Sequence, residues 1–110
     1  MGNRNVEISI YRKKLKYDKY CVEVGQGDTI TWKMIAKTVL PFAIMVKDSV
    51  SPLVWSTAVS PAGKNVLVGT VRADAEPGHY FYGTCVWDGQ GLIVDDPDII
   101  VKPPKDGNKG

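Results

Sequence analysis

The sequence predicts an all-β protein, built as a sandwich or barrel of about seven or eight strands. Apolar residues alternate with polar ones in short segments along most of the chain. Turn residues, such as the Gly-Gln-Gly-Asp stretch at 25–28, separate these segments. No stretch combines an apolar period of 3.6 residues with helix-capping residues. These three observations favour a fold made of strands alone.

Three strands are predicted in the first half of the chain. Residues 6–10, 21–24 and 30–34 each alternate with a period of two, which is typical of strands with one buried face. The basic run at 12–16 follows the first of them. We expect this run to form a loop or a sheet edge protected by its charges.

The second half of the chain shows the same pattern. Strands are predicted at 42–46, 65–72, 79–84 and 98–101. Pro97 precedes the last strand, at a position where a missing N–H is tolerated. The segment 49–63 contains prolines and serines and is predicted to be a long irregular crossover.

Length and composition indicate one domain. The chain has 110 residues, which suits a single core, and we expect a domain at 1–102 with a flexible C-terminal tail at 103–110. The formal net charge of +2 is too small to imply nucleic-acid binding. No apolar run is long enough to span a membrane, and no secretory signal peptide is expected at the N-terminus.

Two cysteines leave several possibilities open. Cys21 and Cys85 could form a disulfide if their Cα atoms lie within about 7 Å of each other. Cys85 could otherwise be a small residue at a strand end, or a soft-metal ligand in a weak site with Asp88 and Met45. The single histidine, His79, has no evident orienting carboxylate in the sequence, and no catalytic motif occurs. We therefore predict that the protein is not an enzyme.

Two tryptophans are predicted to lie in loops. Trp55 falls in the predicted crossover, and Trp87 follows the strand that ends at 84. Exposed tryptophans often anchor protein interfaces, but they can equally cover the end of a sandwich. Both interpretations stand at this stage.

Three segments give the chain a resemblance to a known family. These are VEVGQGDTITWK (22–33), PFAIMV (41–46) and GHYFYGTC (78–85), the last followed by a loop and the strand DPDIIV (96–101). From about residue 6 to 101 the sequence resembles the cupredoxins, the small proteins that carry blue copper. The resemblance implies a Greek-key β-sandwich.

The same resemblance implies that the type 1 copper ligands are missing. Such a site needs two histidines and a cysteine, and this chain has one histidine. Phe42 stands where the family has its first ligand histidine, and strand parity places Thr84 at the cysteine. Trp87 and Asp88 lie about where the second histidine is expected. We expect aromatic side chains to fill the metal cavity, with no cofactor bound.

The resemblance also leads to a functional prediction. We expect a non-catalytic binding or structural domain that contacts a protein partner, or a second copy of itself, through a loop end holding Phe42, Trp55 and Trp87. The family implies a periplasmic or extracellular location. One alternative is a copper-binding or electron-transfer protein with an atypical site at Cys85. The other is an immunoglobulin-like adhesion module, which would differ in strand order.

Overall fold

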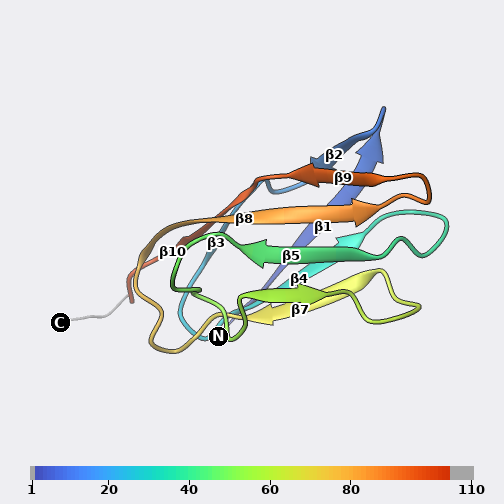
Figure 1. The fold of residues 1–110 in the computed structure, drawn as a ribbon. Coiled ribbons are helices and arrows are strands. Elements are labelled where there is room, and N and C mark those ends of the chain that lie inside the picture. Colours follow the sequence, from blue (N-terminus) through green and yellow to red (C-terminus); the bar gives the residue numbers. More distant parts are fainter. Residues whose placement is uncertain (1, 105–110) are drawn as a thin grey trace.

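The computed structural model describes residues 2–104 and contains two packed sheets (Figure 1). Their ten strands, in chain order, are β1 (Asn3–Tyr11), β2 (Lys14–Tyr17), β3 (Cys21–Val24), β4 (Thr29–Met34), β5 (Phe42–Val46), β6 (Thr57–Val59), β7 (Val66–Thr70), β8 (Gly78–Trp87), β9 (Leu92–Asp95) and β10 (Asp98–Val101). The prediction of an all-β sandwich is confirmed.

The smaller sheet has four strands in the order β2-β1-β4-β7. Its central pair, β1 and β4, is parallel, and both flanking strands are antiparallel to their neighbours. β1 and β2 are joined by a two-residue turn in which Arg12 and Lys13 both have positive φ, 53° and 63°. Positive φ at both central positions is the geometry of a type I′ hairpin turn.

The larger sheet has the order β3-β10-β8-β5-β6, with β9 also paired to β8. The long strand β8 pairs with β5 along one flank. On its other flank it pairs first with β10 and then with β9, so these two short strands follow each other along the same side of β8. Because β10 is parallel to β3, each sheet contains one parallel pair. The two sheets of an immunoglobulin domain are antiparallel, so the immunoglobulin-like alternative is not supported.

Three strands were not predicted as such, which explains why the structure has ten strands instead of seven or eight. β2 lies within the predicted basic edge, β6 within the predicted crossover, and β9 in a segment taken as loop. Each has only three or four residues and only one paired neighbour. Their order depends on pairing with that one neighbouring strand more than on their own alternation.

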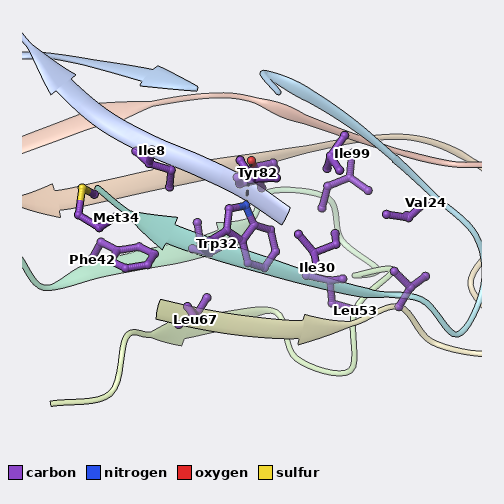
Figure 2. Close-up of a cluster of buried hydrophobic side chains, with 14 of the residues drawn as sticks. Ile8, Val24, Ile30, Trp32, Met34, Phe42, Leu53, Leu67, Tyr82 and Ile99 are labelled. Carbon is purple, nitrogen blue, oxygen red and sulfur yellow. Dashed lines mark hydrogen bonds between the residues drawn. The ribbon is translucent and has the colours of Figure 1, made fainter. Parts of the chain in front are cut away.

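Buried apolar side chains from both sheets fill the space between them (Figure 2). At the centre Trp32 of β4 and Tyr82 of β8 are both fully buried, with ring centroids 5.6 Å apart. The Trp32 Nε1–H donates a hydrogen bond of 3.1 Å to the Tyr82 hydroxyl, which joins the two sheets through a polar contact in the core. This contact helps to fix β8, the strand on which the candidate site is built.

The predicted tail lies mostly outside the described residues. Of residues 103–110, only Pro103 and Pro104 are described, and they are exposed after the end of β10. No helix within residues 2–104 has the length and apolar character needed to cross a membrane.

Candidate interaction surface

The outer face of the larger sheet is built on the alternation of β8. Tyr82, Thr84 and Val86 point into the core and are buried, whereas Cys85 and Trp87 point outward. This confirms the strand parity inferred from the sequence, which placed Thr84 and Cys85 on opposite faces. It also corrects the placement of Trp87, which ends a strand and does not lie in a loop.

Apolar side chains from four neighbouring strands meet on this outer face. Residues directly opposite each other in antiparallel strands project to the same side. Cys85 lies opposite Val94 of β9 and Ala43 of β5, and Ala43 lies opposite Val59 of β6. Two positions away along β8, Trp87 pairs with Leu92, and in the other direction Gly83 pairs with Met45. We call the following side chains the apolar face: Ala43, Met45, Val59, Cys85, Trp87, Leu92 and Val94.

The apolar face is open to solvent. Leu92, Val94 and Val59 are 66%, 68% and 63% exposed, and Trp87 and Met45 are 46% and 42% exposed. With side chains of ordinary size these fractions amount to roughly 500 Å² of apolar surface, near the upper end of the largest patch on a typical monomer. Apolar patches of this size on monomeric proteins are often functional.

The outer face of the smaller sheet shows the opposite chemistry. Its central strands present polar residues, and the Thr29 and Thr31 hydroxyls donate hydrogen bonds to Asn3 Oδ1 at 2.7 and 3.0 Å. Val68 of β7 is an isolated exposed valine there. An antiparallel-rich sandwich usually exposes polar outer faces, so the larger sheet departs from the pattern that its companion follows.

Charged groups border the apolar face on two sides. Lys47 extends over Gly83, where an added Cβ would lie 3.6 Å from the Lys47 Cε, and it forms an ion pair with Asp96. Beyond Trp87, the Asp88 Oδ1 accepts hydrogen bonds from the backbone N–H groups of Gln90 and Gly91 at 2.8 and 2.9 Å. These two bonds hold the pKa of Asp88 below its ordinary value.

The three aromatic residues expected at one loop end do not form one surface. Phe42 is only 1% exposed and belongs to the core, so it cannot contact a partner in this fold. Trp87 lies at the end of the larger sheet where β5 begins, since its backbone N–H donates to Pro41 O at 2.9 Å. Trp55 lies in the β5–β6 connection, which leaves from the opposite end of β5 (Figure 1).

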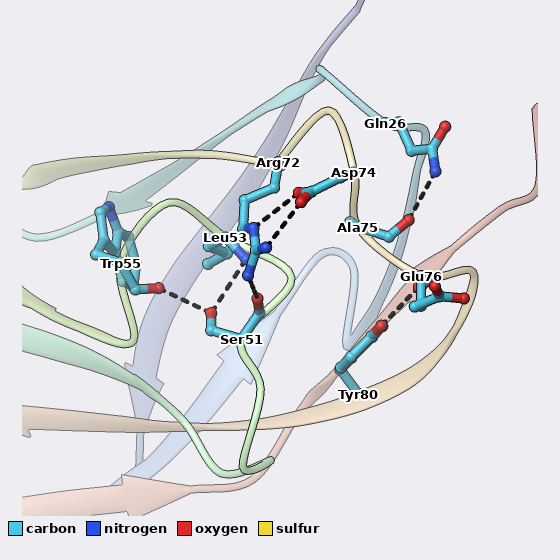
Figure 3. A network of polar contacts seen from close by, with 9 residues as sticks. All are labelled: Gln26, Ser51, Leu53, Trp55, Arg72, Asp74, Ala75, Glu76 and Tyr80. Carbon is cyan, nitrogen blue, oxygen red and sulfur yellow. Dashed lines mark hydrogen bonds and ion pairs between the residues drawn. The ribbon is translucent and has the colours of Figure 1, made fainter.

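Trp55 covers the core at that opposite end. Its ring is half-buried and lies 6.0 Å from Trp32, above Gly69. A local network holds it: the Ser51 hydroxyl donates to Trp55 O at 2.8 Å, and Arg72 binds both Ser51 O and the Asp74 carboxylate (Figure 3). This environment matches the covering role that the sequence left open for Trp55.

The possible Cys21–Cys85 disulfide is not formed in the structure, in which both cysteines are free. Cys21 lies opposite Asp98, and Asp98 lies opposite Phe81 on β8. Cys85 is therefore two strands away, roughly 10 Å, and four residues further along, roughly 13 Å. This separation far exceeds the Cα distance that a disulfide can bridge, about 7 Å. Both cysteines lie in the larger sheet.

The weak metal site considered for Cys85 does not assemble into a ligand cluster. Met45 and Cys85 share the apolar face, but one Asp88 carboxylate oxygen already accepts two backbone hydrogen bonds. Among the described residues, no group of three or more His, Cys, Asp or Glu side chains could hold a metal ion. His79 instead contacts Asp98, with 2.8 Å between Nε2 and Oδ2, an orienting carboxylate that sequence reasoning missed.

Two positions at which the resemblance expects copper ligands, Phe42 and Thr84, lie in the core. Phe42 and Val86 are cross-strand neighbours and both are buried hydrocarbon. Thr84, at the predicted cysteine position, is 1% exposed, and its hydroxyl has no hydrogen-bond partner of ordinary geometry. A blue-copper centre takes imidazole and thiolate ligands, and these side chains supply none.

Sequence reasoning missed most of the apolar face. Residues 92–94 are Leu, Ile and Val, a short apolar run of the kind found in strands, but the segment was taken as a loop after Cys85. Only the pairing of β9 with β8 shows that these residues join Trp87 and Cys85.

Comparisons with solved structures identify the architecture. A pseudoazurin from Sinorhizobium meliloti matches with a TM-score of 0.53 and 19% identity, over 96% of this chain and 77% of its own. The P52G mutant of amicyanin, in a reduced Cu(I) form, matches with a TM-score of 0.52 and 18% identity, over 89% of this chain and 82% of its own. The fold is cupredoxin-like.

A further neighbour comes from a virus. The N-terminal domain of phage TP901-1 ORF48 matches with a TM-score of 0.51 and 14% identity, over 94% of this chain and 100% of its own. No protein-family model matches the sequence, and neither does any curated protein. At these identities the cupredoxin-like neighbours establish the fold and nothing more.

Proposed function

We propose that this cupredoxin-like protein is a non-catalytic binding or structural domain that works through the apolar face. The observation that carries the proposal is the cluster of exposed apolar side chains on β5, β6, β8 and β9. Among residues 2–104, five of the thirteen large apolar residues that are exposed belong to this one patch. The proposal keeps Trp87 as an anchor and replaces Phe42 and Trp55 with residues of β9 and β6.

The free energy of burying apolar area favours a partner that covers the apolar face. Burying apolar area stabilises an interface by about 25 cal/mol per Å², although the costs of association take up much of this gain. Trp87 is the type of residue that dominates interface energies. Around it, Leu92 and Val94 offer flat aliphatic surface on a rigid sheet, which loses little conformational entropy when a partner binds.

We further propose that the domain has no type 1 copper site. The proposal is supported by the single histidine in the sequence and by the hydrocarbon at Phe42 and Val86. Adding Cu(II) to the purified protein should produce no intense blue absorption band, and a band of that kind would contradict the proposal. A periplasmic or extracellular location is proposed from the resemblance alone.

The fold neighbours represent two settings of this architecture, a copper protein and a domain of a larger protein. The amicyanin neighbour is named with Cu(I), whereas the phage neighbour is named as the N-terminal domain of a larger protein. A domain that holds other parts together, and carries no redox centre, is the role that we propose for this chain.

The proposal is tested with a fluorescent apolar probe on dilute protein. We expect 8-anilinonaphthalene-1-sulfonate to bind the native domain, and the Val94→Glu variant to lose most of this fluorescence. Val68→Glu is the matched control, because Val68 is an exposed strand valine on the other sheet. Equal probe binding by the native protein and Val94→Glu, with both folded by circular dichroism, would show that the apolar face is not the binding surface.

A further inference from the structure

We infer that the partner covering the apolar face is a second copy of this chain, packed sheet against sheet about a two-fold axis. The inference rests on the proposed function, because it names the occupant of the same surface. Three properties of the apolar face support it: its charge balance, its symmetry along β8, and its area.

The charges next to the apolar face suit contact with an identical surface. A surface that meets its own copy brings like charges together unless they are neutralised within each copy. Lys47 and Asp96 are ion-paired to each other over Gly83. None of the seven side chains of the apolar face itself is an Asp, Glu, Lys or Arg. The seven side chains and this ion pair therefore bring no net charge to a contact between two copies.

The positions of large and small residues along β8 suit antiparallel packing. Trp87 and Gly83 lie equally far from Cys85, on the same side of the strand. A two-fold axis across the strands at Cys85 therefore places Trp87 of one copy over Gly83 of the other. There the indole meets the Met45 methyl group and the aliphatic stem of Lys47, which cover Gly83. Contacts of tryptophan with methionine sulfur and with a lysine stem are favourable.

The same axis brings opposite charges and matching aliphatic residues together. Val94 lies level with Cys85 on β9, so it faces Val94 of the second copy. Lys47 leans toward the level of Gly83, so it lies near Asp88 of the second copy, just beyond Trp87. Aligned sheets pack with their strands within about 30° of each other and about 10 Å apart. This geometry allows the side chains of the two facing sheets to interdigitate.

The apolar face by itself supplies more than half of the area that a specific dimer buries on each partner. Stable interfaces bury about 800 Å² on each partner. The apolar face supplies roughly 500 Å², and a border that includes Thr57, Pro41 and the Lys47–Asp96 pair surrounds it. The resulting interface has an apolar centre and a polar rim, which is the usual arrangement in homodimers.

A charge exchange at Val94 tests the proposed packing. Because Val94 faces its own copy, Val94→Glu and Val94→Lys should each place two like charges together. We expect each variant alone to dimerise about tenfold more weakly or worse, measured by sedimentation over a range of concentrations. A one-to-one mixture of the two should recover dimers, and Val68→Glu should dimerise like the native protein. If the Val94 variants do not fold, the same exchange is made at Val59, which also lies on the Cys85 row.

The two free cysteines provide a second measurement. Cys85 lies at the centre of the proposed interface, whereas Cys21 is exposed on β3, outside the apolar face. In a Cys21→Ser variant, alkylation of Cys85 should slow by about tenfold or more as protein concentration rises through the dimer transition. In a Cys85→Ser variant, alkylation of Cys21 should not change with concentration.

These results separate the two proposals. A native protein that stays monomeric at all concentrations, with Cys85 alkylated at a constant rate, overturns self-association. The proposed function still stands in that case if the apolar probe binds dilute native protein and not Val94→Glu. The inference is also overturned if the Val94 variants dimerise like the native protein and Cys85 is alkylated at the same rate in the dimer. Such dimers use another surface.

Discussion

The hydrogen bond between Trp32 and Tyr82 should contribute measurably to stability. In Tyr82→Phe both rings remain, and only the acceptor for the Trp32 Nε1–H is removed. Trp32 is fully buried, so its N–H has no access to water as a replacement partner. Leaving a buried donor unsatisfied costs about 1–3 kcal/mol. For a domain of this size we expect the melting temperature to fall by roughly 4–15 °C.

The assay is urea unfolding of dilute protein, followed by tryptophan fluorescence and extrapolated to water. Tyr80→Phe is the matched control on the same strand, because the Tyr80 hydroxyl donates to Glu76 O at an exposed position. We expect that control to change stability by less than about 0.5 kcal/mol.

A double-mutant cycle identifies the cause of the effect. In a Trp32→Phe background there is no indole N–H to leave unsatisfied, so Tyr82→Phe should cost about 1 kcal/mol less than in the native protein. The reasoning is refuted if Tyr82→Phe is neutral. It is also refuted if the loss is the same with and without Trp32, because the source would then be another contact of the Tyr82 hydroxyl and not its bond to the indole.

Two further predictions concern the core and its tyrosines. Gly69→Ala should destabilise the domain by about 1–3 kcal/mol, because the added Cβ would lie 2.8 Å from the Trp55 ring and 3.1 Å from the Trp32 ring; unchanged stability in urea unfolding would contradict this placement of Trp55. Burial raises the pKa of both Tyr17 and Tyr82 above the ordinary tyrosine value, so the folded state holds these protons more tightly than the unfolded state. Their contribution to stability should be complete below about pH 10 and be lost as the pH rises further toward the folded-state values. Tyrosinate absorbance should show Tyr17 and Tyr82 ionising only as the chain unfolds. Reversible ionisation of all five tyrosines in the folded protein near pH 10 would contradict the prediction.

Apolar alternation predicted the strands correctly where they are long and have one buried face. The segments beginning at Val6, Val22, Ile30 and Phe42 all lie in strands with alternating burial. Pro97 was correctly placed just before the last strand. These predictions succeeded because burial of one face imposes a period of two on the residues of the strand itself.

The prediction failed for short edge strands, and the candidate site depends on two of them. β6 and β9 have three and four residues and gain their order from β5 and β8. Apolar residues such as Val59 and Leu92 did not indicate a binding surface in the sequence, because single exposed apolar residues are common on protein surfaces. They form a patch because strand pairing brings them together, and the pattern of one segment does not show that pairing.

By itself the sequence determined that the chain forms an all-β sandwich, and that a site needing two histidines could not be built, because composition limits the available ligands. The tertiary structure alone decided which side chains share a surface. It moved Phe42 into the core, separated Trp55 from Trp87, and left Cys21 and Cys85 apart. The register of β8 against β5 and β9 assembled the apolar face. The physical reason is that pairing between strands, a long-range property, sets which residues become neighbours.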